Sequence, residues 1–321
     1  MSGMALGPGP EFDRIRHILG RLGPHAEGAG GDCAILPDGP GKVVVSVDLS
    51  MEGVHFRRDW LTMEEIGWRA AAAALSDLAA EGAATVGVLA SVGVPRGSPE
   101  EDLLALMAGV GNAAAEAGGV VLGGDLSASP QWLVDVAVIG RAERPITRAG
   151  ARPGDGVWVT GQLGGSRAAL VTWRRGSTPE PEARRAFAHP VPRIEAGRAL
   201  AAAGARAMID VSDGLGGDAG HLAAASGVAV EIDLARIPVA PAAVAAAKEV
   251  GIPAVHFAAL GGEDYELLVA LPDTFSTTQA RQFSGSTGLE LTRIGEVRSG
   301  DRARFTLDGR AIALEGYDHF A

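Results

Sequence analysis

Two patterns of apolar residues alternate along the chain and predict strands and helices in turn. Runs of β-branched and other apolar residues, typical of buried strands, occupy 42–48, 86–94, 120–122, 133–140, 156–161 and 207–211. Segments rich in alanine and leucine, bounded by polar or glycine residues, predict helices at 62–81, 100–117, from about 166, and at 195–203. Residues 174–192 are rich in proline and arginine, and we expect them to be irregular.

Short-range signals define the ends of several of these elements. Thr62 and Glu65 have the spacing of a helical capping box. The strand at 120–122 is expected to open directly into Gly123-Gly124-Asp125, and Asp308-Gly309 indicates a hairpin turn. Residues 147–153 have the character of a linker. Strands and helices alternate on both sides of it, so we predict two α/β domains, residues 1–148 and 149–321.

Composition narrows the class of protein. A chain of 321 residues suits about two domains, and a net charge of −11 is unfavourable for binding nucleic acid or anionic membranes. One cysteine, Cys33, excludes an internal disulfide framework and cysteine-based zinc sites, which fits a reducing compartment. No secretory signal is visible, and no apolar run approaches the ~20 residues of a membrane helix. We therefore expect a cytoplasmic protein without nucleic-acid or membrane partners.

Aspartates lie at the ends of apolar runs or within them, and this is the main chemical signal: Asp32, Asp48, Asp77, Asp125, Asp210 and Asp213. Any one of them is more often a solvated turn or cap residue than a ligand. Asp77 differs because it continues the apolar stripe of Ile66, Ala70 and Ala73 on one helix face, with no basic residue three or four positions away. A buried carboxylate needs a partner, and oxygen ligands without a His/Cys cluster favour Mg²⁺.

The common phosphate-binding and nucleophile motifs are absent. The only lysines are Lys42 and Lys248, neither of them in a glycine-rich loop, so no P-loop or protein-kinase lysine exists. No G-x-S-x-G nucleophile elbow occurs. Phosphate binding in this chain would therefore depend on metal ions, arginines or helix N-termini.

A set of short motifs recurs in a fixed order along nearly the whole chain: GDCA (31–34), SVD (46–48), EGVHF (52–56), LSDLAA (75–80) with GA (82–83), GGD (123–125), TR (147–148), PGD (153–155), HPVPR (189–193), IDVSDGL (209–215), GGEDYEL (261–267) and GYDHF (316–320). Together they resemble the thiamine-monophosphate kinase family, within the aminoimidazole-ribonucleotide-synthetase-like superfamily. The resemblance implies an α/β (α+β) fold of two domains, with a mixed-sheet N-terminal domain that forms a homodimer and a C-terminal α/β domain.

The same resemblance implies a reaction and a set of residue roles. The reaction would be ATP- and Mg²⁺-dependent phosphorylation of thiamine monophosphate to thiamine diphosphate, the last step of thiamine diphosphate biosynthesis, by direct in-line transfer. Several Mg²⁺ ions would be held by Asp32, Ser46, Asp48, Asp77, Asp125, Asp210 and Asp213. ATP would contact Gly124, Asp125, Arg148 and Ser212. Thiamine monophosphate would contact His55, Glu263 and Tyr317.

No general base is expected, because the acceptor is a phosphate whose second pKa is about 6 and is already largely ionised at neutral pH. The chain departs from the family pattern at Gly31, Val47, Ala74 and Leu126, where the family more often has polar side chains. One alternative is a related ATP-dependent synthetase that makes aminoimidazole ribonucleotide or selenophosphate. Another is a non-catalytic protein that binds divalent metal ions on acidic glycine loops, although the short fixed repeat typical of such proteins is absent.

Overall fold

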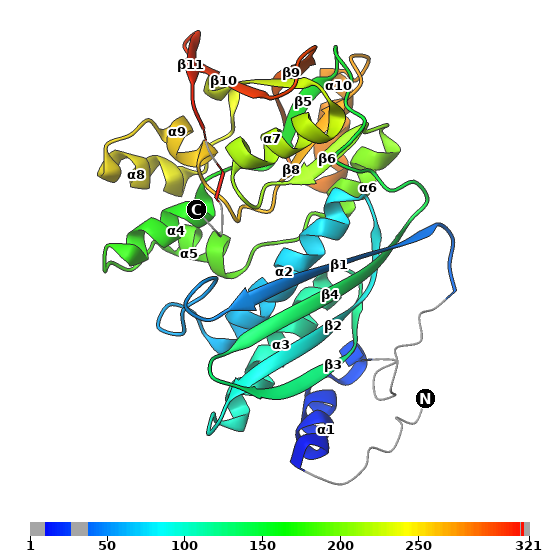
Figure 1. Cartoon of the computed structure of the whole chain (residues 1–321), viewed down its shortest axis with the longest axis vertical. Helices are drawn as coiled ribbons and strands as arrows, with labels where there is room; N and C mark the ends of the chain where they lie inside the picture. Colours follow the sequence, from blue (N-terminus) through cyan, green and yellow to red (C-terminus); the bar gives the residue numbers. More distant parts are fainter. Residues whose placement is uncertain (1–9, 27–37, 315, 318–321) are drawn as a thin grey trace. The chain divides into compact units, whose positions relative to one another are not determined.

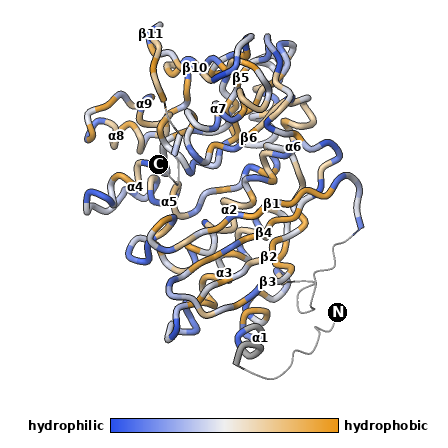
Figure 2. Tube along the Cα trace, in the orientation of Figure 1, coloured by the Kyte–Doolittle hydropathy of each residue, from blue (hydrophilic) through white to orange (hydrophobic). Residues whose placement is uncertain are grey.

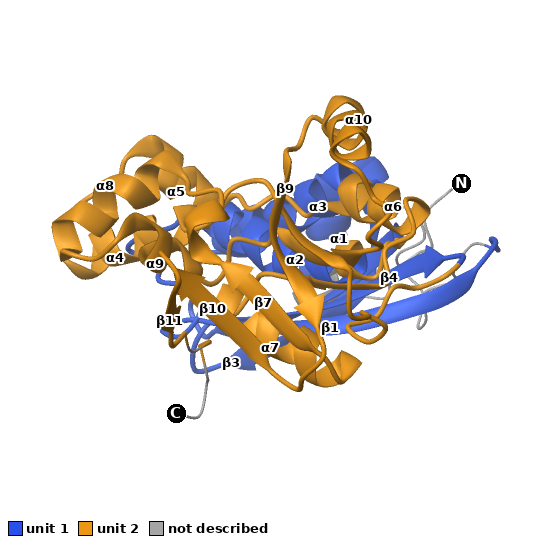
Figure 3. Cartoon of the chain, turned by 90° about the horizontal axis from the view of Figure 1, so that it is seen from above, with its two compact units in different colours: residues 1–78, 84–143 blue, residues 79–83, 144–321 orange. Residues whose placement is uncertain are grey.

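The computed structural model describes residues 10–26, 38–314 and 316–317, and it divides into two compact units (Figure 1, Figure 3). Unit 1 comprises residues 1–78 and 84–143, and unit 2 comprises residues 79–83 and 144–321. The chain passes into unit 2 between Glu143 and Arg144, whereas the sequence indicated a change after Arg148. No helix within the described ranges is long and apolar enough to cross a membrane.

Unit 1 is built on a four-stranded sheet of β1 (Lys42–Met51), β2 (Ala84–Pro95), β3 (Val120–Ser129) and β4 (Leu133–Ala142). The strand order is β1-β4-β2-β3, and only β2 and β3 run parallel. The mixed sheet implied for this domain is therefore confirmed.

Strand β3 is longer than its apolar residues predicted. The expectation that the strand ends before Gly123 is wrong, because Gly123, Gly124 and Asp125 pair with Leu89, Ala90 and Ser91 of β2. A Cβ on Gly124 would lie 1.9 Å from the Ala90 carbonyl oxygen, so only glycine permits this approach.

Helices α2 (Met63–Ala80) and α3 (Glu100–Glu116) pack with their backbones in close approach. A Cβ on Gly67 would lie 1.8 Å from the Leu106 carbonyl oxygen, and one on Gly109 would lie 1.9 Å from that of Glu64. The capping box at the start of α2 is confirmed, because the Thr62 N–H donates to Glu65 Oε2 at 2.8 Å and the Glu65 N–H donates to Thr62 Oγ1 at 3.3 Å. Helix α1 (Pro10–Leu22) and the short η1 (Gly23–Ala26) precede β1.

The two faces of β1 differ in burial. Ser46, Asp48 and Ser50 are half-buried or buried, whereas the apolar residues that alternate with them are exposed. The exposed fractions of Val45 and Val47 are 65% and 62%. Figure 2 shows the hydrophobic colouring that runs along this strand and its neighbours. Unit 1 therefore presents an apolar sheet face without cover from its own described residues.

Unit 2 contains a seven-stranded sheet of β5 (Gly156–Thr160), β6 (Ala207–Asp210), β7 (Ala229–Asp233), β8 (Leu267–Leu271), β9 (Leu291–Arg298), β10 (Ala303–Leu307) and β11 (Arg310–Ile312). The order is β11-β10-β7-β9-β5-β8-β6, and among these strands only β7 and β10 run parallel. The predicted hairpin at Asp308-Gly309 is confirmed, because it joins β10 to β11.

The helices of unit 2 are α4 (Gly165–Arg174), α5 (Pro181–Ala188), α6 (Ile194–Ala202), α7 (Leu215–Ser226), α8 (Pro241–Val250), α9 (Ala254–Ala259) and α10 (Thr277–Thr287), with η2 (Leu234–Arg236). The expectation that residues 174–192 are irregular is wrong for α5. Pro181 stands at the first helical positions, where proline is tolerated, and Phe187 is buried edge-on against Trp173, 5.3 Å between ring centroids.

Candidate functional site

Unit 1 brings together two of the predicted metal ligands. The Ser46 hydroxyl on β1 donates a hydrogen bond of 2.5 Å to Oδ2 of Asp77 on α2. Asp77 therefore has a protein partner 31 positions away on another element, and its contact with a metal ion stays a prediction. The hydroxyl and the carboxylate together still form an oxygen-only donor set, which suits a hard divalent cation.

The strand register places the other candidates of unit 1. Asp48 pairs with Val136 of β4, which pairs with Ala90 of β2, and Ala90 pairs with Gly124 of β3. Asp48 therefore shares a sheet face with Ser46 and lies in one row with Gly124. Asp125 occupies the next position of β3, so side-chain alternation directs it to the other face.

Val47, one of the departures from the family pattern, also lies on that other face. It is exposed there and does not line the face that carries Ser46 and Asp48.

His55 lies just after β1, in a turn that fixes its ring. Nδ1 accepts a hydrogen bond of 3.1 Å from the Met51 N–H, and the His55 N–H donates to the Met51 carbonyl. A neutral ring whose Nδ1 accepts carries its proton on Nε2. Nε2 is then a hydrogen-bond donor, which suits contact with an anion better than removal of a proton.

In unit 2, backbone hydrogen bonds join three distant segments around the loop of residues 211–214. The Glu263 N–H donates to the Ser212 carbonyl at 2.8 Å, and the Tyr317 N–H donates to the Asp213 carbonyl at 3.0 Å. Asp210 ends β6 immediately before this loop. The structure thus gathers five predicted site residues of unit 2, Asp210, Ser212, Asp213, Glu263 and Tyr317, into one neighbourhood.

The segment that carries Glu263 has an uncommon backbone. Glu263 and Tyr265 have φ angles of +63° and +52°, in the left-handed region that bulky side chains rarely adopt. The Tyr265 N–H donates to the Val211 carbonyl, and the Val211 N–H donates to the Glu266 carbonyl. These bonds hold the strained conformation, which is a common property of functional segments.

A fourth acid of this neighbourhood, Asp218, could not be recognised from the sequence. It lies in the first turn of α7 and is only 1% exposed, and its Oδ2 accepts a hydrogen bond of 3.2 Å from the Asp213 N–H. Burial, followed by the nearby Asp210 and Asp213 carboxylates, raises the pKa of Asp218 to about 8. Its position five residues after Asp213, at the start of a helix, was the signal available in the sequence.

The remaining predicted contact residues are Asp32 and Arg148. Asp32, like Cys33 and the Gly31 departure, lies outside the described residues. Arg148 is exposed at the start of unit 2, and its carbonyl accepts a hydrogen bond of 3.0 Å from Ser226 Oγ. Its guanidinium has no hydrogen-bond partner within the described residues.

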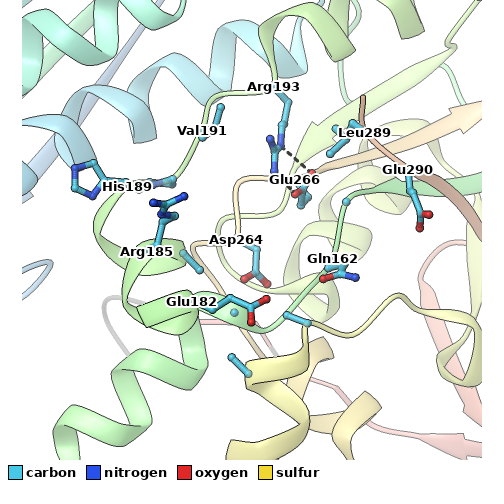
Figure 4. A pocket seen from close by; sticks show the side chains of 16 residues that line it. Gln162, Glu182, Arg185, His189, Val191, Arg193, Asp264, Glu266, Leu289 and Glu290 are labelled. Carbon is cyan, nitrogen blue, oxygen red and sulfur yellow. Dashed lines mark hydrogen bonds and ion pairs between the residues drawn. The ribbon is translucent and has the colours of Figure 1, made fainter. Parts of the chain in front are cut away.

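A cavity of about 420 Å³ in unit 2 borders the segment that carries Glu263 (Figure 4). Its lining includes Arg185, Asp264 and Glu266 but none of the predicted contact residues. Glu266 forms a two-pronged ion pair with Arg193 and accepts from Thr160 Oγ1 at 2.6 Å, so its charge is already compensated. Asp264 caps α4 by accepting from the Gly164 N–H at 2.7 Å, and burial raises its pKa to about 8.

The carboxylates fit Mg²⁺ in small sets rather than as one cage. Within 10–26, 38–314 and 316–317, no group of three or more His, Cys, Asp or Glu side chains is arranged to hold a metal ion. Mg²⁺ is typically bound by one or two carboxylates, with waters and substrate phosphates completing the shell. The Ser46 hydroxyl and the Asp77 carboxylate, 2.5 Å apart, form an oxygen donor set that fits a shell of this kind.

Comparison with known proteins first identifies the class. The family model of the AIR synthase related protein, N-terminal domain, matches residues 30–142, and that of the C-terminal domain matches residues 152–308. Fold and matches together define an AIR synthase-related protein.

Similarity to individual proteins is more specific. A thiamine-monophosphate kinase of Mycobacterium tuberculosis is 35% identical over 309 residues, which cover 95% of this chain and 88% of the relative. The crystal structure of the thiamine-monophosphate kinase of Stenotrophomonas maltophilia K279a has a TM-score of 0.82 and 32% identity, and covers 94% of this chain and 98% of that chain. AaThiL complexed with AMPPCP and TMP has a TM-score of 0.79 and 31% identity, and covers 100% of both chains. The chain belongs to the thiamine-monophosphate kinase family.

Proposed function

We propose that this protein transfers the γ-phosphoryl group of ATP to thiamine monophosphate, giving thiamine diphosphate and ADP. The observation that carries the proposal is the backbone hydrogen bonding that brings the segments of Glu263 and Tyr317 to the 211–214 loop. Likeness over the whole chain to AaThiL complexed with AMPPCP and TMP supports the two substrates. Identity of 35% to a thiamine-monophosphate kinase, over 95% of this chain, favours this reaction over that of a related synthetase.

The main difficulty of this reaction is electrostatic. Two unit charges 4 Å apart at an effective dielectric constant of 20 repel by about 4 kcal/mol, and both reactants carry several negative charges. Bound Mg²⁺ ions would neutralise this repulsion and align the two phosphates for in-line transfer. We assign their ligands to Asp32, Ser46, Asp48, Asp77, Asp125, Asp210 and Asp213.

The remaining contacts divide between the nucleotide and the acceptor. We assign Gly124, Asp125 and Ser212 to ATP, together with the Arg148 guanidinium as a clamp on its phosphates. His55 would donate from Nε2 to the acceptor phosphate, and Glu263 and Tyr317 would position the thiamine end. No side chain has to remove a proton from the acceptor phosphate, because that phosphate is already largely ionised near pH 7.

A second copy of the chain is the proposed occupant of the open face of β1. Val43, Val45, Val47 and Leu49 expose apolar side chains there in one row along the strand. Apolar faces of this kind mark protein–protein interfaces, and two identical faces related by a twofold axis would cover each other. This arrangement supports the homodimer through N-terminal domains. Asp125, which side-chain alternation directs to the same face of the sheet, would then bind Mg²⁺ and ATP beside the second copy.

The test is formation of thiamine diphosphate from ATP and thiamine monophosphate, followed by chromatography. We expect one ADP for each thiamine diphosphate, loss of product when EDTA removes Mg²⁺, and recovery when Mg²⁺ is returned. Absence of thiamine diphosphate at saturating substrates and Mg²⁺ would refute the proposed activity. Product formation that EDTA leaves unchanged would refute the metal requirement.

A further inference from the structure

The backbone of the 211–214 loop is bonded from several directions. Its carbonyls accept from the N–H groups of Tyr265, Glu263, Tyr317 and Asp218, in order from Val211 to Gly214. The N–H group of Asp213, in the middle of the loop, donates to Oδ2 of Asp218 at 3.2 Å. The Asp218 side chain therefore supplies an acceptor to a residue that the proposed function places at Mg²⁺.

The placement of Asp218 is uncommon for a structural acceptor. An acidic residue in the first turn of a helix more often caps the N–H groups of that helix or faces solvent. Asp218 instead reaches back to residues before α7, and it is 1% exposed beside Asp210, which is 4% exposed. Burying a carboxyl next to other carboxyls costs free energy, and the hydrogen bond from the Asp213 N–H offsets part of that cost.

We propose that Asp218 is a positioning residue that fixes the 211–214 loop so that Ser212 and Asp213 present their side chains to Mg²⁺ and the ATP phosphates. Asp218 does this by accepting from the Asp213 backbone N–H group and not by binding metal itself. The claim that the loop binds Mg²⁺ and ATP rests on the proposed function. The claim that Asp218 orders the loop concerns the protein without ligands and does not depend on that function.

The first readout needs no substrate. Hydrogen–deuterium exchange of the peptide that contains residues 211–214 is measured without metal or nucleotide in wild type, Asp218→Ala and Asp218→Asn. We expect exchange about tenfold faster in Asp218→Ala, equivalent to about 1.4 kcal/mol, because the Asp213 N–H group loses its acceptor. Asp218→Asn should recover most of the protection, because its amide oxygen can accept. Ser276→Ala, which removes the N-cap of α10 in the same unit, should leave this peptide unchanged.

The second readout is the Mg²⁺ concentration that gives half-maximal thiamine diphosphate formation. It should rise several-fold in Asp218→Ala and return toward wild type in Asp218→Asn. Wild-type exchange in Asp218→Ala overturns the proposal, and so does an Asn variant as defective as the Ala variant, because the negative charge would then be what matters. If Asp218→Ala does not fold, near-wild-type exchange and Mg²⁺ dependence in Asp218→Asn support the proposal, and their loss overturns it. Failure of wild type to make thiamine diphosphate would refute the proposed function, while the exchange result would still decide the role of Asp218.

Discussion

Replacing Gly217 with alanine adds one methyl group where helix α7 meets the C-terminal segment. The new Cβ would lie 2.9 Å from Gly316 Cα, whereas carbon atoms pack without strain at about 3.5–4.0 Å. The neighbouring Tyr317 N–H donates to the Asp213 carbonyl at 3.0 Å, and this bond is lost if the segment moves away. Gly217→Ala therefore tests whether docking of the C-terminal segment contributes to the substrate site.

The expected change is small for stability and larger for substrate binding. Alanine is favoured over glycine in a helix by about 0.5–1 kcal/mol, which offsets most of the about 1 kcal/mol lost with the Tyr317 hydrogen bond, so the free energy of unfolding should change little. If docking of the C-terminal segment weakens by about 1 kcal/mol, the KM for thiamine monophosphate should rise up to about fivefold. The KM for ATP should stay unchanged, because Tyr317 is assigned to the thiamine end.

Gly220→Ala is the matched control, since it lies on the same helix and nothing comes within 4 Å of its added Cβ. It should share the gain in helix stability and leave both KM values as in wild type. Steady-state kinetics and thermal unfolding of the two variants measure these quantities. Truncation after residue 315 should raise the same KM, and Gly217→Ala in the truncated chain should add nothing. Equal thiamine-monophosphate KM values in the Gly217 and Gly220 variants would refute the reasoning.

Three further predictions follow from other parts of the molecule. Asp48→Asn or Asp125→Asn should lower kcat at least about a hundredfold with little change in Tm, because a lost ligand uncovers phosphate repulsion; wild-type kcat in both variants at millimolar Mg²⁺ would contradict the assignment. Val45→Asp should convert a dimer to a monomer in light scattering, whereas Val244→Asp, at another exposed valine, should not; a dimer in both would refute the proposed interface. Burial raises the pKa of Asp264 in the folded state above its value in the unfolded chain. Between about pH 4 and 8 the folded protein therefore keeps a proton that the unfolded chain has released. The free energy of unfolding consequently falls as pH rises through that range. Urea unfolding at pH 5, 6 and 7 gives the slope of the free energy of unfolding against pH. Asp264→Asn should make this slope less negative than in wild type, by at most about 1.4 kcal/mol per pH unit. Identical slopes in the two proteins would show that Asp264 is ionised.

Local chemistry could be predicted from the sequence where neighbouring residues decide it. The capping box at Thr62 and Glu65 and the turn at Asp308-Gly309 depend on residues within three positions of one another, and both predictions are confirmed. Elements that depend on distant partners could not be predicted in this way. Strand β3 continues through Asp125 because these residues pair with β2 in parallel. Helix α5 is stabilised by packing of Phe187 against Trp173.

The candidate site shows the same division. Its residues could be identified from motifs, but the contact between Ser46 and Asp77 joins a strand and a helix whose packing no periodicity specifies. Convergence of Asp213 and Tyr317 depends on a backbone hydrogen bond between segments about a hundred residues apart. Asp218 was missed because an acid in the first turn of a helix is common, and only its burial and its bond to Asp213 distinguish it.

The most direct test of the central claim follows the phosphoryl group itself. ATP labelled with radioactive phosphorus at the γ position is incubated with the protein, Mg²⁺ and either thiamine monophosphate or thiamine. The account predicts label in thiamine diphosphate from the first acceptor and no labelled product from the second, because only a phosphate acceptor is ionised without a protein base. Label released only as inorganic phosphate, or transferred equally well to the hydroxyl of thiamine, would contradict it.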